Sequence, residues 1–148
     1  MKKPMVLLCL LILPMAFGLA GYAAKPNAED DILVRLVKSA LSPMTFMPSF
    51  LDDAAIEVVS SGSERDVLDK DALVAFFKQS REASTQGDIT DFKLISLTKN
   101  QRYASIVYTA QFMVRHGDQT TRRRIEANEI WELQPIGWTK LFGAVDLR

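Results

Sequence analysis

Residues 102–147 read RYASIVYTAQFMVRHGDQTTRRRIEANEIWELQPIGWTKLFGAVDL, and this stretch decides the fold. Its apolar pattern predicts strands over residues 102–115, 120–134 and 138–147, with turns at residues 116–118 and 135–137. Residues 89–98 predict one strand more, ahead of a turn at 99–101. Short connections between consecutive long strands predict an antiparallel meander, and runs of this length are typical of a strongly curved sheet.

Alternation along these strands predicts which side chains face the concave side of the sheet. The predicted inward set is Ala104, Ile106, Tyr108, Ala110, Phe112, Val114, Ile125, Ala127, Glu129, Trp131, Leu133, Leu141, Val145 and Leu147. The opposite face of the third strand carries Arg122, Arg124, Glu126, Asn128 and Glu132, which suits solvent. A β-bulge would invert part of this assignment.

Helices are predicted upstream of the strands. Asn27 is a candidate N-cap for a first helix that ends at Ser42-Pro43. Its apolar residues at helical spacing are Ile32, Leu33, Leu36, Val37, Ala40 and Leu41. Residues 44–51 predict a loop with one helical turn, and residues 55–60 a short strand closed by a turn at 61–63. Asp69 caps a second predicted helix that buries Leu73, Phe76 and Phe77 and stops before Gly87. The fold class is therefore α+β, with two to three N-terminal helices packed in the concave face of a strongly curved antiparallel sheet.

The N-terminus has the order of a secretory signal, which is basic, then apolar, then small. Lys2 and Lys3 precede an unbroken apolar run from Met5 to Leu13, and small residues follow up to Ala24. We expect a signal peptide over residues 1–23 and one domain over 24–148, working in the periplasm or outside the cell. The alternative is an anchor in the inner membrane formed by residues 5–24, since about 20 apolar residues can span a bilayer.

Composition excludes several chemistries. Cys9 is the only cysteine and lies in the signal, so the mature chain has no disulfide, thiolate nucleophile or thiolate metal ligand. Beyond the signal, acidic residues exceed basic ones by two, whereas a nucleic-acid-binding domain is normally basic. Phosphate-binding, dinucleotide-binding, zinc-protease and serine-hydrolase motifs are missing. We expect no cofactor, no metal and no nucleic-acid partner.

Three segments resemble the nuclear transport factor 2-like superfamily. They are FLDDAAIEV at residues 50–58, LDKDAL at 68–73 with Phe76-Phe77, and IWEL at 130–133 with GWTKL at 137–141. The resemblance covers residues 29–148 and implies a cystatin-like cone: helices packed into a curved sheet, with a pocket at the wide end. The superfamily includes ketosteroid isomerases, SnoaL-like cyclases, dehydratases and secretion-system scaffolds, so fold alone does not choose a function.

The residues that catalyse in the best-known enzymes of this superfamily do not carry over. Isomerase-like members place an aspartate base just after the first strand, where this chain has Val58 and Val59 after Glu57. Their oxyanion-binding tyrosine lies on the first helix, at Leu36 and Val37 here. Dehydratase-like members use histidine, and the only one is His116, in a predicted turn. The resemblance therefore favours a binding domain over an enzyme, and we assign no catalytic residue.

Glu129 is the one candidate site that the pattern singles out. It falls on the apolar face of its strand, beside Trp131, with Arg123 on the same face and Tyr108 on the neighbouring strand. A buried carboxylate is costly unless it is paired, so an inward Glu129 needs Arg123, Tyr108 or a ligand. The pocket candidates are thus Tyr108, Arg123, Glu129 and Trp131, against the alternatives of a bulge that turns Glu129 outward or a purely structural ion pair.

Three functions remain open. The first is an exported domain that binds a small, partly apolar ligand in the cone pocket. The second is a structural or adaptor module of an envelope or secretion assembly. The third is a SnoaL-like enzyme that uses Glu129 as acid or base. A homodimer through the outer sheet face is a further expectation, because Val107, Met113, Ile130 and Phe142 make that face apolar.

Overall fold

A computed structural model describes residues 31–82 and 87–148. The predicted signal, the candidate cap Asn27 and the cleavage site lie outside the described residues. In chain order the elements are α2 (Ile32–Leu41), the 3₁₀ turn η3 (Pro48–Phe50), β1 (Leu51–Ser61), β2 (Glu64–Asp69), α3 (Lys70–Glu82), β3 (Gly87–Lys99), β4 (Tyr103–His116), β5 (Gln119–Gln134) and β6 (Gly137–Leu147).

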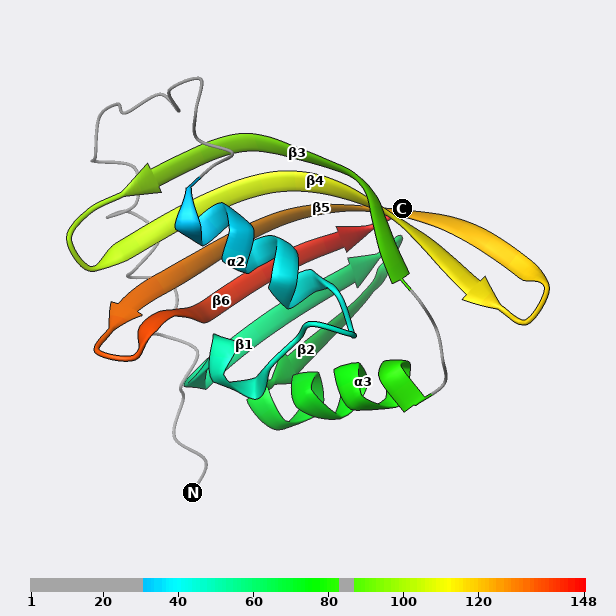
Figure 1. Ribbon diagram of the computed structural model, residues 1–148, viewed down its shortest axis with the longest axis horizontal. Coiled ribbons are helices and arrows are strands. Elements are labelled where there is room, and N and C mark those ends of the chain that lie inside the picture. Colours follow the sequence, from blue (N-terminus) through cyan, green and yellow to red (C-terminus); the bar gives the residue numbers. More distant parts are fainter. Residues whose placement is uncertain (1–30, 83–86) are drawn as a thin grey trace.

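The strands form a six-stranded curved sheet in the order β2-β1-β6-β5-β4-β3 (Figure 1). β3 to β6 make the predicted antiparallel meander, and each lies within two residues of its predicted bounds. β1 runs parallel to β6, so the sheet is mixed rather than wholly antiparallel. The chain reaches this arrangement because α3 carries it from β2 to the far edge at β3, and the meander then returns to β1. The α+β class and the cone architecture are confirmed.

Helix α2 lies across the concave face of the sheet (Figure 1). Asp31 is its N-cap, with the side chain accepting a hydrogen bond from the Leu33 N–H at 2.8 Å, and Ser42 is its C-cap as predicted. Leu33, Val34 and Val37 are fully buried. The predicted apolar stripe was wrong at its first residue, because Ile32 is exposed and Val34 is buried instead.

Helix α3 lies along the β1–β2 side of the sheet (Figure 1). Leu73 is buried as predicted, and the Phe77 ring stacks on that of Phe46 with centroids 4.0 Å apart. Phe76 was wrongly predicted to be buried and is exposed. With η3 the described residues hold two α-helices and one 3₁₀ turn, within the predicted count.

Strand β2 was not predicted. Its sequence ERDVLD has no alternation of apolar and polar residues, because β2 is an edge strand and five of its six residues are exposed. It pairs with β1 around the turn at Gly62, whose φ of +61° is a conformation that glycine adopts without strain.

The inward face of β4 and β5 is the predicted one. Ala104, Ile106, Tyr108, Ala110, Ile125, Ala127, Glu129 and Trp131 are all buried. β6 departs from prediction, because a bulge pairs Trp131 with Lys140 and leaves Leu141 without a register partner. Val145 is buried as predicted, but Leu133 and Leu147, which were also predicted to face inward, lie at exposed strand ends. Lys140 is buried, although alternation from Leu141 predicted that it faces outward.

The β4–β5 hairpin extends past the rest of the sheet (Figure 1). β3 pairs with β4 only as far as Val114, so the last residues of the hairpin form a two-stranded ribbon. Arg115 is exposed there, and Arg122 and Arg123 are exposed at the base of this ribbon, opposite Met113 and Phe112. None of the helices in the described part of the chain is long and apolar enough to cross a membrane.

Candidate functional site

Glu129 lies inside the fold and is held by two aromatic side chains. It is 2% exposed, and its Oε1 and Oε2 accept hydrogen bonds from the Tyr108 hydroxyl at 3.0 Å and from Trp131 Nε1 at 2.8 Å. Trp131 lies two residues after Glu129 on β5, and Tyr108 on β4 pairs with Ala127, which lies two residues before Glu129. Alternation therefore brings Tyr108, Glu129 and Trp131 to one face of the sheet. The sequence predicted this grouping.

Lys140 and Glu57 complete the cluster. Lys140 is 6% exposed; its Nζ donates a hydrogen bond to Glu57 Oε2 and lies 3.4 Å from Glu129 Oε1. Glu57, Gly143 and Glu129 are register partners across β1, β6 and β5, so the ammonium lies between two carboxyl groups. A Cβ on Gly143 would lie 3.0 Å from Glu57 Oε2, so Glu57 would have to shift by a few tenths of an ångström to admit one. We call Glu57, Glu129, Lys140, Tyr108 and Trp131 the inner cluster.

The cluster fixes the protonation of two of its members. Burial disfavours the charged form of Lys140, but the charges of Glu129 and Glu57 outweigh it, and the pKa of Lys140 is raised above its usual 10.5. Burial, together with the charge of Glu129, raises the pKa of Tyr108 well above 10.0. At neutral pH Lys140 is therefore an ammonium and Tyr108 a neutral hydrogen-bond donor.

The inner cluster satisfies its own hydrogen bonds. Among the described residues, every buried side-chain nitrogen and oxygen has a partner. Glu129 receives three donors, at about four acceptor sites, and is 2% exposed, so a substrate has little access to its carboxyl group. This geometry supports a structural ion pair more than a general base.

Arg123 does not join the other three predicted pocket residues. It is exposed on the projecting hairpin, opposite Phe112, six residues from Glu129 and therefore about 20 Å along the strand. Glu57 and Lys140 take the place expected for it. Glu57 lies on the same face of β1 as buried Ala55, so alternation along β1 could have predicted that it points inward. Lys140 could not be predicted in this way, because the bulge in β6 changes which residues face inward.

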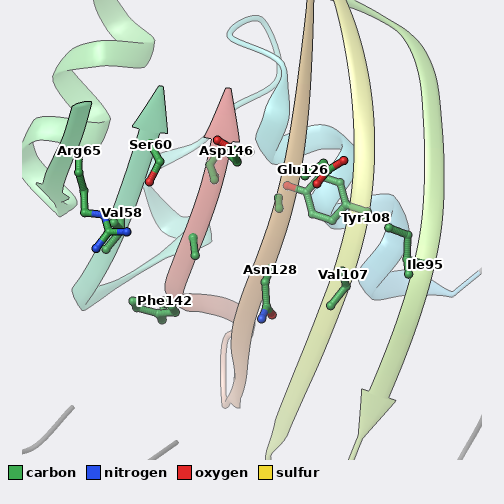
Figure 2. A pocket seen from close by; sticks show the side chains of 13 residues that line it. Val58, Ser60, Arg65, Ile95, Val107, Tyr108, Glu126, Asn128, Phe142 and Asp146 are labelled. Carbon is green, nitrogen blue, oxygen red and sulfur yellow. The ribbon is translucent and has the colours of Figure 1, made fainter. Parts of the chain in front are cut away.

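A groove of about 490 Å³ opens on the outer face of the sheet. Figure 2 shows Val58, Asn128, Val107 and Phe142 on the side of the strands away from α2, whereas Tyr108, which also lines the groove, lies on the α2 side. The groove therefore lies on the opposite face from the predicted cone pocket. Its apolar lining comes from Val58, Ile95, Val107, Phe142 and Ala144. Ala144 has the smallest side chain of these five and pairs with both Val58 and Asn128, so a small side chain lies between two larger ones there.

A polar row borders this groove. Arg65, Ser60, Asp146 and Glu126 are successive register partners across β2, β1, β6 and β5. The two acids are already paired, since the Arg148 guanidinium lies 3.0 Å from a carboxylate oxygen of Glu126 and 3.0 Å from one of Asp146. Arg65 has no carboxylate within 4.0 Å in the described part of the chain.

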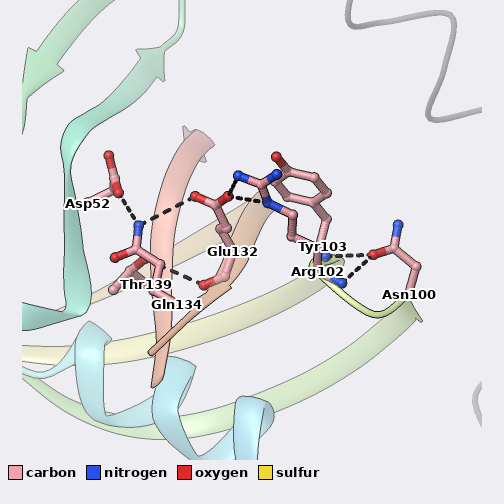
Figure 3. Close-up of polar contacts among 7 residues, drawn as sticks. All are labelled: Asp52, Asn100, Arg102, Tyr103, Glu132, Gln134 and Thr139. Atoms are coloured by element: carbon pink, nitrogen blue, oxygen red, sulfur yellow. Dashed lines mark hydrogen bonds and ion pairs between the residues drawn. The ribbon is translucent and has the colours of Figure 1, made fainter. Parts of the chain in front are cut away.

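A second polar network fastens one end of the sheet (Figure 3). Gln134 Nε2 donates to Asp52 Oδ2 at 2.5 Å, and Arg102 Nε donates to Glu132 Oε1 at 2.7 Å. The Arg102 hydrogen bond lowers the pKa of Glu132. Asn100 Oδ1 accepts from the backbone N–H groups of Arg102 and Tyr103 and so shapes the β3–β4 turn. These contacts join strand ends and turns, which is a structural role.

No protein-family model and no curated protein matches the sequence. Solved structures do match the fold. An NTF-2-like protein of unknown function from Silicibacter pomeroyi DSS-3 aligns with a TM-score of 0.60 at 14% identity, over 84% of this chain and 100% of that one. A ketosteroid isomerase-like protein from Erwinia carotovora atroseptica SCRI1043 aligns with a TM-score of 0.57 at 11% identity, over 77% of this chain and 86% of that one. A domain of unknown function with a cystatin-like fold from Nostoc punctiforme PCC 73102 aligns with a TM-score of 0.58 at 14% identity, over 83% of this chain and 78% of that one. The TM-scores establish the shared fold, which is the one that the sequence resemblance implied, and at identities this low they establish the fold alone.

Proposed function

We propose that this chain, which has the cone fold of nuclear transport factor 2-like proteins, is an exported binding domain for a small, partly apolar ligand and carries out no reaction on it. The observation that carries the proposal is the outer groove. Its volume of about 490 Å³ lies within the range of small-ligand sites, roughly 300–1,000 Å³. Its lining combines apolar side chains with a few polar groups along one border, as such sites do.

The inner cluster supports the second part of the proposal, that the domain carries out no reaction on its ligand. Three donors occupy Glu129, and Lys140 is held between two carboxylates. A group that must exchange protons with a substrate needs an accessible lone pair or proton, and these groups use theirs on one another.

A neutral fluorescent probe tests binding in the groove. N-phenyl-1-naphthylamine should bind the wild-type protein with one saturable site per chain. Ala144→Leu enlarges a side chain that lines the groove and should weaken this binding at least about tenfold, because the added carbons overlap the ligand. Ala54→Leu adds the same atoms at an exposed position of β1 outside the groove and should leave it unchanged. Equal affinities for the two variants, or no saturable binding, would contradict the proposal.

Export is the third part of the proposal, and it rests on the order of residues 1–24. The full chain, expressed in a Gram-negative bacterium, should appear in the periplasmic fraction with Ala24 as its first residue. Recovery of the uncleaved chain in the membrane fraction would instead support the anchor formed by residues 5–24.

A second copy of the chain is the other occupant that the outer face fits. Val67, Ile95 and Phe142 are 66%, 56% and 36% exposed, although all are large and apolar. If they form a homodimer, light scattering after gel filtration should give twice the chain mass, and Ile95→Asp should restore the monomer. A monomer at all concentrations would leave the face to the small ligand.

A further inference from the structure

We propose that the ligand of the outer groove is an amphipathic carboxylate, whose acid group binds Arg65 and Ser60 and whose apolar part lies over Val58, Ala144 and Val107. This inference rests on the proposed function and names its ligand class.

The sign of the uncompensated charge in the groove supports an anionic ligand. Glu126 and Asp146 share Arg148, and Arg124 lies 3.7 Å from Glu126 as a second cation. Arg65 has no such partner among the described residues. Figure 2 shows its side chain extending over Val58 toward the groove. A ligand cation would have to compete with two arginines for the acids, whereas a ligand anion finds a cation that is not engaged.

The arrangement of Arg65 and Ser60 suits a carboxylate. The two residues are register partners on adjacent strands and both line the groove, so their side chains begin about 5 Å apart on one face. A guanidinium presents a planar pair of N–H donors that matches the two oxygens of a carboxylate, and a serine hydroxyl supplies one donor more. Both donors can therefore reach one acid group.

The groove offers a surface for the apolar part of the ligand, which extends across the strands from Arg65 and Ser60. Val58, Ala144, Asn128 and Val107 form the next row of register partners, across β1, β6, β5 and β4. Three strand spacings make this row about 14 Å long. Phe142 lines the groove along one side of it. An acyl chain of medium length would lie along this row with its acid group at Arg65.

Three probes with the same ten-carbon chain test the inference, each measured by displacement of N-phenyl-1-naphthylamine at low ionic strength. Decanoate should bind about 1.5- to fivefold more tightly than decanol, the range for one exposed charge pair, and decyltrimethylammonium more weakly than decanol. Arg65→Gln should remove the preference for decanoate without changing decanol binding, and Arg65→Lys should restore part of it. Arg122→Gln removes an exposed arginine of the same sheet outside the groove and should keep the full preference.

The outcomes separate this inference from the function on which it rests. If decanol and decanoate bind equally, or Arg65→Gln leaves their ratio unchanged, the groove binds ligands but the assignment of a carboxylate is wrong. Tightest binding of decyltrimethylammonium would overturn it as well. If no probe displaces the dye and the dye itself does not bind, the proposed function fails together with the inference.

Discussion

At the scale of single residues, the inner cluster is where the molecule departs from an ordinary apolar core. Glu57, Glu129 and Lys140 bring three ionisable groups together inside the fold, where loss of hydration opposes each charge. Their mutual attraction and the donors from Tyr108 and Trp131 offset that loss. Such a cluster is sensitive to the removal of any one member, because the remaining charges stay buried without compensation.

Glu129→Gln should therefore destabilise the protein by about 2–4 kcal/mol. The amide keeps the shape of the side chain, but it removes a charge that compensates Lys140 and turns an N–H₂ group toward other donors. Urea unfolding measures the loss. Glu126→Gln, which changes a carboxylate on the outer face of the same strand, should cost much less. Equal losses would show that burial of Glu129 contributes little.

High pH should destabilise the fold through Tyr108 and Lys140. Both have a folded pKa above the usual values of 10.0 and 10.5, so their contribution is fully present below those values and is lost as pH rises through the folded pKa. The urea concentration at the unfolding midpoint should therefore fall as the pH is raised above about 10. Tyr108→Phe should make this fall shallower. Tyr103→Phe, on the same strand but exposed, should leave the slope as it is; an identical slope in both variants would contradict the assignment.

At the scale of elements, α2 depends on one residue for both its start and its attachment to the sheet. Asp31 caps the helix through the Leu33 N–H and also accepts a hydrogen bond from Lys99 Nζ at 2.5 Å, at the end of β3. One side chain thus fixes the first turn of the helix and ties it to the edge strand of the sheet.

Asp31→Ala should lower the free energy of unfolding by about 1–2 kcal/mol, since it removes the cap and the ion pair together. Asp31→Asn keeps a capping oxygen and loses only the charge, so about half of that loss should return. Thermal unfolding of the three proteins gives the comparison. An Asn variant as unstable as the Ala variant would mean that the contact with Lys99, not the cap, carries the effect.

The meander was predictable because its signals are local. Alternation over long runs gave β3 to β6, and the turns at Gly117 and Gly137 have the positive φ that glycine adopts readily. Strand β2, the parallel pairing of β1 with β6 and the bulge at Trp131 were not predictable, because each depends on which strands become neighbours. The same reason explains the candidate sites. The alternation of inward and outward side chains along β5 was enough to predict that Glu129 faces inward. The burial of Lys140 and the outer groove depend on contacts between strands that are distant in the sequence.

At the scale of the whole molecule, the two faces of the sheet have different roles. α2 covers the concave face, where the core and the inner cluster lie. The outer face has no helix over it among the described elements, although it carries apolar side chains such as Val58 and Phe142. An antiparallel meander can leave one face in water, but it usually makes that face polar. The apolar residues of this face are the reason to look for a ligand or a second copy there.

The projecting β4–β5 hairpin has a practical consequence for anyone who handles the protein. Beyond Val114 the ribbon is only two strands wide, and such ribbons open readily. Trypsin cuts after arginine. Arg115 is exposed in that ribbon, and Arg122 and Arg123 are exposed at its base on β5. Brief digestion should nick the chain there first and give two fragments on a denaturing gel. The halves should still migrate together under native conditions, because β4 and β5 each remain paired with the rest of the sheet.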